Sequence, residues 1–167
     1  MKYPIGIQSF ETIIEEGYVY LDKTGLVYDL THNGHVYFLS RPRRFGKSLL
    51  VSTLKCYFQG RKELFKGLAI DELEKDWNQY AVFHLDFVGQ NFVEPYTLDK
   101  VLEQFVSQAE LTYGRDPLAL TLTSRFQAAL KNAHTKTGRR VVVLIDEYDK
   151  PLLDVMDMDI SIKNEYG

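Results

Sequence analysis

The sequence has little that would suit a membrane protein, a disulfide-bonded fold or a disordered tail. Its 167 residues include one cysteine, five prolines and eleven glycines. The longest apolar run, Val141 to Ile145, is far shorter than the roughly 20 residues that span a bilayer. The single cysteine, Cys56, cannot form an internal disulfide, which fits a reducing compartment. No cleavable apolar segment opens the chain, so we expect a cytoplasmic protein that is not bound to a membrane.

The composition is that of an ordinary globular protein, and its charges are unevenly distributed. The net charge of −3 provides no general attraction to nucleic acid. Between Leu39 and Lys66, however, there are eight Lys or Arg residues and one acidic residue. Between Asp146 and Gly167 there are seven acidic residues and two lysines. The first segment suits an anion, and the second suits a cation or a polarised water molecule.

The pattern of apolar residues predicts helices that alternate with strands, which is typical of the α/β class. Strands are expected at 36–39, 81–87 and 141–145. The last of these is apolar at every position, as in strands of a parallel sheet that are buried on both faces. Between residues 60 and 81 the pattern favours an irregular polar stretch. Helices are expected at 10–16 after a Ser9 cap, 22–34 after an Asp22 cap, 47–59, 97–113 with a Thr97 cap, and 121–136.

The sequence RPRRFGKS at residues 41–48 joins an expected strand to an expected helix. It matches the phosphate-binding P-loop pattern G-x-x-x-x-G-K-[ST] at every fixed position except the first, where Arg41 replaces glycine. The replacement demands an ordinary backbone conformation there but removes no group that would face a phosphate. A solvated basic loop between a strand and a helix is the simpler alternative.

Three residues of this loop carry the chemistry of a nucleotide site. Gly46 would let backbone N–H groups approach the phosphates, and Lys47 would supply a positive charge for the β- and γ-phosphates. Ser48 would offer its hydroxyl to Mg²⁺, and the helix that begins here adds its positive end. The spacing therefore predicts a site for ATP and Mg²⁺.

The second element of the expected site is acidic and follows the last expected strand. In P-loop enzymes an Asp at this position, here Asp146, holds Mg²⁺, and a following Glu, here Glu147, polarises the attacking water. A polar strand end without function is the alternative. Parallel strands would bring Asp146 and Lys47 to the same sheet edge, where open α/β sheets bind ligands. We therefore expect an α/β fold with a P-loop NTPase-like parallel sheet flanked by helices.

The chain resembles a group of mainly bacterial AAA-ATPase-like proteins over nearly its whole length. In that group this domain commonly precedes a PD-(D/E)XK nuclease-like domain, and RPRRFGKS is the usual loop, so that Arg41 is typical of it. The resemblance rests on four stretches: YPIGIQSF at 3–10, YVYLDKT at 18–24, FLSRPRRFGKS at 38–48 and LIDEYDKPL at 144–152.

The resemblance implies ATP and Mg²⁺ binding and assigns roles to individual residues. Lys47 and Glu147 would be the catalytic groups, and Ser48 and Asp146 the metal ligands. It also implies that the stretch from Tyr20 to Lys23 packs near the nucleotide base. The expected partners are a nuclease-like domain, DNA indirectly, and other copies of the chain. The implied nucleotide contacts are Arg43, Arg44, Phe45, Gly46, Lys47, Ser48 and Leu49.

The expected organisation is one domain, with a lead-in at 1–35 and the ATPase core at 36–167. We expect this core to be the N-terminal portion of a longer one. After Asp146 the sequence provides neither a further strand with a polar sensor residue nor an arginine, since the last arginine is Arg140.

Two main hypotheses follow, and two further ones remain open. The chain is either the ATP-binding part of an AAA-like ATPase, or an incomplete nucleotide-binding module without activity of its own. In the second case it could regulate a fused nuclease-like partner. A small-molecule kinase would also use a P-loop, and the basic segment could bind DNA directly.

Overall fold

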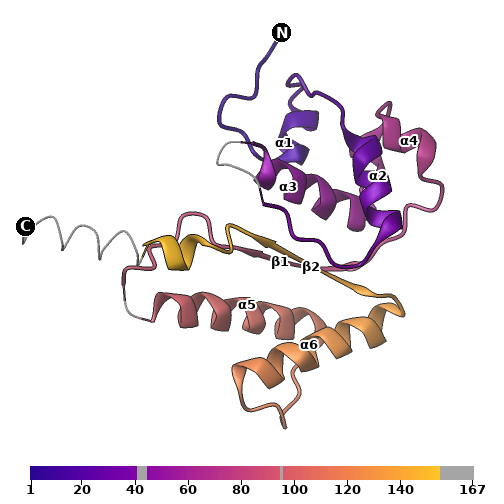
Figure 1. The fold of residues 1–167 in the computed structure, drawn as a ribbon. Coiled ribbons are helices and arrows are strands. Elements are labelled where there is room, and N and C mark those ends of the chain that lie inside the picture. Colours follow the sequence, from indigo (N-terminus) through magenta and orange to yellow (C-terminus); the bar gives the residue numbers. More distant parts are fainter. Residues whose placement is uncertain (41–44, 95, 155–167) are drawn as a thin grey trace, which may run out of the picture. The chain divides into compact units, whose positions relative to one another are not determined.

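The computed structural model describes residues 1–40, 45–94 and 96–154 (Figure 1). The chain divides into two compact units, Met1–Val82 and Phe83–Gly167, and each is described by itself. No helix in the described ranges is long and apolar enough to cross a membrane. The elements in chain order are α1 (Phe10–Glu15), α2 (Thr24–Asn33), α3 (Lys47–Phe58), the 3₁₀ helix η1 (Lys62–Phe65), α4 (Ala69–Leu73), β1 (Ala81–Asp86), α5 (Thr97–Tyr113), α6 (Leu122–Thr137) and β2 (Val141–Asp146).

Local capping sets the ends of the helices in the first unit. The side chain of Ser9 accepts a hydrogen bond from the Thr12 backbone N–H at 3.2 Å, which confirms the predicted cap of α1. After α3 the chain turns at Gly60, which has a φ of 70° that favours glycine. The helices predicted at 10–16, 22–34 and 47–59 are therefore confirmed to within two residues.

Asp22 ties α2 to α4. Its Oδ1 accepts from the Thr24 backbone N–H at 2.8 Å and from the Thr24 hydroxyl at 2.7 Å, but the capping position falls on Lys23, so the predicted Asp22 cap is wrong by one residue. Its Oδ2 accepts from the backbone N–H of Ala69 at 2.7 Å, at the start of α4. The Thr24 hydroxyl oxygen in turn accepts from the Ile70 N–H at 3.1 Å. The sequence pattern missed α4, because its caps come from residues about 47 positions earlier in the chain.

Apolar side chains of α1, η1 and α4 form the core of the first unit. Phe10, Phe65 and Ile70 are completely buried. The ring of Phe65 lies 4.8 Å from that of Phe10 and 5.1 Å from that of Trp77, measured between ring centroids. A backbone-to-side-chain hydrogen bond from Phe10 N–H to Ser52 Oγ at 2.9 Å joins α1 to α3. These contacts hold α3 in place from one side.

The prediction of a strand at residues 36–39 is wrong. These residues belong to no helix or strand, and Val36 is 92% exposed. A strand needs a hydrogen-bonded neighbour, and the sheet within the described part of the chain consists of β1 and β2. The segment thus has the composition of a strand without the pairing that would make it one.

In the second unit, β1 and β2 form a small parallel sheet flanked by helices. The backbone N–H of Phe87, just after β1, donates to the carbonyl oxygen of Asp146, the last residue of β2, at 3.4 Å. The two strands therefore end at the same edge. The predicted α/β character is confirmed at the level of this mixed fold, but a complete P-loop sheet is not seen among the described residues.

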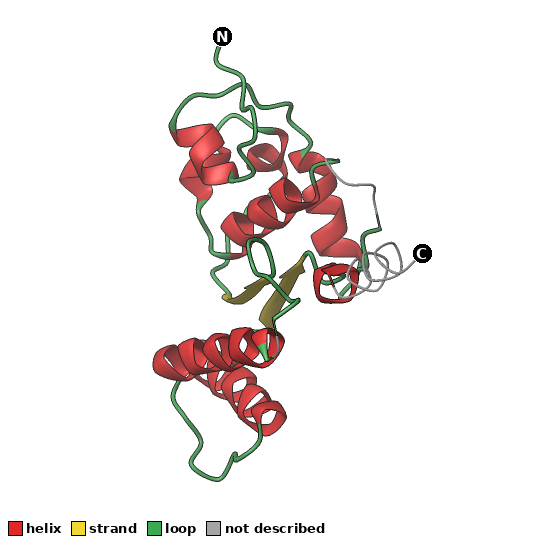
Figure 2. Cartoon of the chain, turned by 90° about the vertical axis from the view of Figure 1, so that its left-hand side faces the viewer, coloured by secondary structure: helices red, strands yellow, loops and turns green. Residues whose placement is uncertain are grey.

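The helical hairpin of α5 and α6 packs beside this sheet (Figures 1 and 2). Phe83 of β1 is buried against Tyr113 of α5, with ring centroids 5.4 Å apart, and against Phe126 of α6 at 6.1 Å. The prediction that the last strand is buried on both faces is wrong in the described part of the chain, because Val143 and Ile145 are exposed. From Val142 to Ile145 half-buried and exposed residues alternate, because the hairpin covers one face.

The ends of the hairpin helices agree closely with the sequence. The helix predicted at 121–136 is found at Leu122–Thr137; Thr121 caps it and shares a capping box with Ser124, and Gly138 follows it in a left-handed conformation. The predicted Thr97 cap is wrong by one residue. Thr97 is the first residue of α5, and the capping position falls on Tyr96, which makes no side-chain capping bond.

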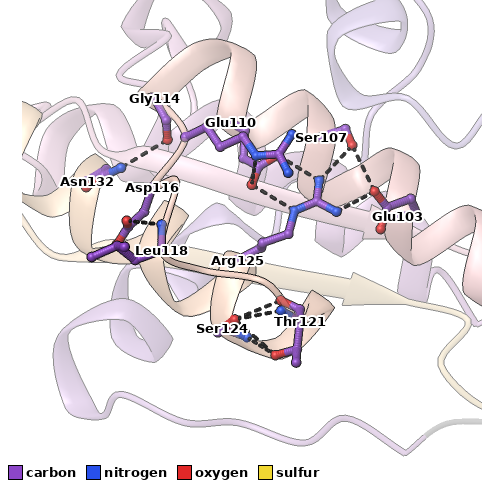
Figure 3. A network of polar contacts seen from close by, with 11 residues as sticks. Glu103, Ser107, Glu110, Gly114, Asp116, Leu118, Thr121, Ser124, Arg125 and Asn132 are labelled. Carbon is purple, nitrogen blue, oxygen red and sulfur yellow. Dashed lines mark hydrogen bonds and ion pairs between the residues drawn. The ribbon is translucent and has the colours of Figure 1, made fainter.

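A buried ion-pair network joins α5 to α6 (Figure 3). Arg125 donates from Nε to Glu110 Oε1 at 2.9 Å and from Nη2 to Glu110 Oε2 at 2.7 Å, a bidentate pairing. It also donates to Ser107 Oγ at 3.1 Å and to the carboxylate of Glu103. These bonds hold the pKa of the Glu110 carboxyl below its usual value, mainly through the hydrogen bonds from Arg125. The network fixes which turns of the two helices face each other.

Candidate functional site

The predicted phosphate loop leads into α3 through a single glycine. Gly46 takes up a left-handed conformation with φ 73° and ψ 25°, which favours glycine over any other residue. Its carbonyl accepts from the Leu50 N–H at 3.0 Å, the first helical bond of α3. The N–H groups at the start of a helix have no carbonyl partner within that helix. The backbone N–H groups of Lys47, Ser48 and Leu49 therefore face out of the helix at its positive end.

The side chains of this first turn are partly open to solvent. Lys47, Ser48 and Leu49 are half-buried, and Phe45 is exposed. No ion pair of Lys47 occurs among the residues that the structure describes. The helix behind them is joined to α1, because the Phe10 N–H donates to Ser52 Oγ at 2.9 Å. The first turn of α3 thus presents a positive charge, a hydroxyl and backbone donors on a fixed helix.

Two predicted nucleotide contacts, Arg43 and Arg44, lie outside the described residues. The stretch from Tyr20 to Lys23, which the resemblance places near the base, contains Asp22, whose carboxylate is engaged at the starts of α2 and α4. Tyr20 packs edge-on against Phe10 with ring centroids 5.2 Å apart. These contacts give both side chains structural roles.

The second predicted element lies in the other unit, at the end of β2. Asp146 is 6% exposed, and its Oδ1 accepts from the backbone N–H of Glu147 at 3.0 Å. Glu147 is half-buried and has a left-handed φ of 52°, which is unusual for a residue that is not glycine. The turn continues with a bond from the Lys150 N–H to the Glu147 carbonyl at 3.0 Å. The sharp turn places two carboxylates directly after a strand, as the sequence predicts.

A further set of contacts near this turn was not found from the sequence. Lys150 Nζ lies 2.9 Å from Asp154 Oδ2, and the same oxygen accepts from the backbone N–H of Phe92 at 3.2 Å. This joins the segment after β2 to the loop after β1. Asp149 Oδ1 is buried and has no hydrogen-bond partner among the described residues. The spacing of Lys150 and Asp154, four residues apart, is the sequence feature from which this ion pair could have been predicted.

The oxygen donors of the two elements suit Mg²⁺, which prefers carboxylate, hydroxyl and water oxygens. Ser48 offers a hydroxyl in the first unit, and Asp146 a carboxylate in the second. Within the described ranges no three His, Cys, Asp or Glu side chains come together as a metal site.

Comparison with known proteins adds a family and one relative. A family model described as "Predicted AAA-ATPase" matches residues 4–166. The chain is 41% identical over 155 residues to an uncharacterized protein in the vnfD 5' region of Azotobacter chroococcum mcd 1. That match covers 92% of this chain and 30% of the relative's length. No solved structure matches the chain.

Proposed function

Because the chain belongs to the predicted AAA-ATPase family, we propose that it binds ATP with its phosphates at the start of α3. The observation that carries this proposal is the left-handed Gly46, which opens a helix whose first N–H groups face outward beside Lys47. Lys47 pairs with the β- and γ-phosphates, and the backbone N–H groups of Ser48 and Leu49 donate to phosphate oxygens. Phe45, Arg43 and Arg44 complete the nucleotide contacts.

In this proposal the hydroxyl of Ser48 and the carboxylate of Asp146 hold Mg²⁺. The ion neutralises charge on the β- and γ-phosphates when it is bound. Glu147 accepts a proton from the attacking water and so acts as the general base. Lys47 stabilises the negative charge that grows on the phosphate oxygens in the transition state.

The activity of the whole protein is a wider proposal, since the chain spans about 30% of the length of the relative it matches. We propose ATP hydrolysis in the cytoplasm by the complete protein, with a nuclease-like domain as its partner and DNA as an indirect one. Assembly into homo-oligomers is part of the same proposal.

Substitution of Lys47 tests the nucleotide site. We expect Lys47→Ala to weaken binding of a fluorescent ATP analogue at least about tenfold, because it removes a charge-assisted contact to phosphate. Lys55→Ala is the matched control, since it removes the same charge from the last turn of the same helix. Equal binding by the Lys47 variant and the unchanged chain would refute the assignment.

Steady-state phosphate release separates an ATPase from a module that only binds. If the chain releases phosphate from Mg-ATP and a chelator abolishes this release, the result would support ATP hydrolysis by the chain itself. Binding that depends on Lys47 without any turnover would instead favour the incomplete nucleotide-binding module, including a regulatory role toward a fused partner.

A further inference from the structure

A second candidate site lies in the first unit, away from the phosphate loop. It is a pocket of about 260 Å³ between α2, the end of α3 and the segment that leads into β1. Tyr57, which lines the pocket, lies ten residues after Lys47 on α3, or about 15 Å along the helix. None of its described lining residues is a predicted contact of ATP or Mg²⁺. The pocket is lined by Thr31, His32, Tyr57, Phe58, Glu74, Asp76, Asn78 and Tyr80.

The pocket holds a nearly buried carboxylate. The side chain of Glu74 is 10% exposed, accepts a hydrogen bond from the Tyr57 hydroxyl, and accepts from the Asp76 backbone N–H at 3.0 Å. Burial acts to raise the pKa of Glu74, but the hydrogen bonds from Tyr57 and from the Asp76 and Lys75 backbone, together with the nearby His32, outweigh it, and the pKa lies below its ordinary value. Glu74 therefore carries a full negative charge at neutral pH.

Among the described residues this charge is not balanced by a permanent cation in the pocket, since no Lys or Arg is among the described lining residues. His32 Nε2 lies 3.8 Å from Glu74 Oε2. His32 Nδ1, however, lies 2.8 Å from the Tyr28 carbonyl oxygen, which can only accept, so Nδ1 carries a proton and the closer polar contact of the ring is with the backbone. The neighbouring Lys75 donates to the Glu72 carbonyl.

The walls of the pocket are aromatic. Phe58 and Tyr80 pack edge to face with ring centroids 5.5 Å apart, and the Tyr80 backbone N–H donates to the Phe58 carbonyl at 2.8 Å. A second carboxylate, that of the exposed Asp76, lies at the rim. Aromatic faces beside carboxylates are the usual means by which proteins bind organic cations. A buried carboxylate also gains most from a partner that carries both a charge and N–H donors.

We propose that this pocket binds the ammonium or guanidinium group of a small organic cation, with Glu74 as the principal contact. The volume equals that of about nine water molecules in the liquid, which suits the head of an alkylamine and not a whole nucleotide. A free amine and the lysine side chain of another protein share this chemistry. The site is independent of the proposed ATP site.

The single tryptophan of the chain provides the assay. Trp77 stands between two lining residues and packs edge-on against Tyr57, with ring centroids 5.9 Å apart, so its fluorescence reports on the pocket. We expect titration with putrescine or with N-acetyl-lysinamide to change this fluorescence, with a dissociation constant in the millimolar range for so small a ligand. Butanol, which is neutral and of similar size, should produce no saturable change. Whichever amine binds more tightly identifies the source of the cation.

Three variants decide whether Glu74 is responsible. Glu74→Gln can still accept the Tyr57 hydrogen bond but loses the charge, so we expect binding at least about tenfold weaker. Glu72→Gln, on α4 and outside the pocket, should bind as the unchanged chain does. Lys47→Ala should also bind the amine normally while losing ATP, which separates this proposal from the nucleotide site.

Saturable binding of butanol, equal amine binding by Glu74→Gln and the unchanged chain, or no response to either amine would each overturn the proposal. Thermal unfolding followed through Trp77 shows whether the variants are folded. Should Glu74→Gln be unfolded, Asp76→Asn takes its place, because Asp76 is exposed at the rim. A severalfold loss of affinity in that variant supports the proposal, and no loss contradicts it.

Discussion

Replacement of Phe65 by alanine is the most direct test of the core of the first unit. Phe65 is 0% exposed and contacts the rings of Phe10 and Trp77. Truncating a fully buried phenylalanine removes its apolar surface from the core and leaves a cavity, which costs about 3–5 kcal/mol. Since whole domains are stable by only about 5–15 kcal/mol, this loss is a large part of the total. We therefore expect Phe65→Ala to lower the urea unfolding midpoint by about a fifth of its value or more.

A milder substitution keeps the measurement quantitative. Ile70 is also completely buried, and Ile70→Val should cost about 0.5–1.5 kcal/mol. A loss of about 1 kcal/mol lowers the thermal unfolding midpoint of a unit of this size by about 4–8 °C, so the thermal midpoint of Ile70→Val should fall by several degrees. Leu26→Ala, at a residue of α2 that is 66% exposed, is the control and should change stability by less than about 0.5 kcal/mol. Trp77 fluorescence during urea unfolding reports all three, and equal midpoints for Phe65→Ala and Leu26→Ala would refute the assigned core.

Two further predictions concern single carboxylates. Asp22→Ala should cost about 1–2 kcal/mol, because one side chain supports the starts of α2 and α4, whereas the exposed Asp29→Ala should be nearly neutral in the same urea titration. Hydrogen bonds outweigh the effect of burial and lower the pKa of Asp22, so its contribution is present at neutral pH and is lost as the pH falls through the folded-state value. In a protein form that turns over ATP, Glu147→Gln should slow phosphate release by about 100-fold or more while ATP binding persists, and unchanged turnover would exclude Glu147 as the base.

The sequence predicts those parts of the fold that depend on neighbouring residues. Ser9 and Thr121 cap their helices through side chains that reach a backbone N–H three residues away, and Gly138 supplies the left-handed turn after α6. The start of α3 at Lys47 belongs to the same class, because Gly46 alone determines it. Such signals lie within one helical turn, so they can be read without knowing the fold.

The features that the sequence could not predict depend on distant residues. Val36 to Leu39 have strand composition, yet composition cannot say whether a neighbouring strand is there to pair with. The exposure of Val143 and Ile145 is decided by how much of the sheet the α5–α6 hairpin covers. The start of α4 depends on Asp22, whose carboxylate caps it from 47 residues away.

The two candidate sites differ in the same way, and the difference explains why one was predicted and the other was not. The phosphate loop is a local device, in which a glycine, a helix start and three successive residues supply the donors. The pocket around Glu74 brings together His32, Tyr57 and Glu74 from three separate segments. The residues next to Glu74 in the sequence form no motif that would mark it as part of a site. The hydrogen bonds that offset the effect of burial on its carboxylate form only on folding. An organic cation would therefore bind only to the folded unit and stabilise it, so the unfolding midpoint should rise with amine concentration in the unchanged chain and not in Glu74→Gln.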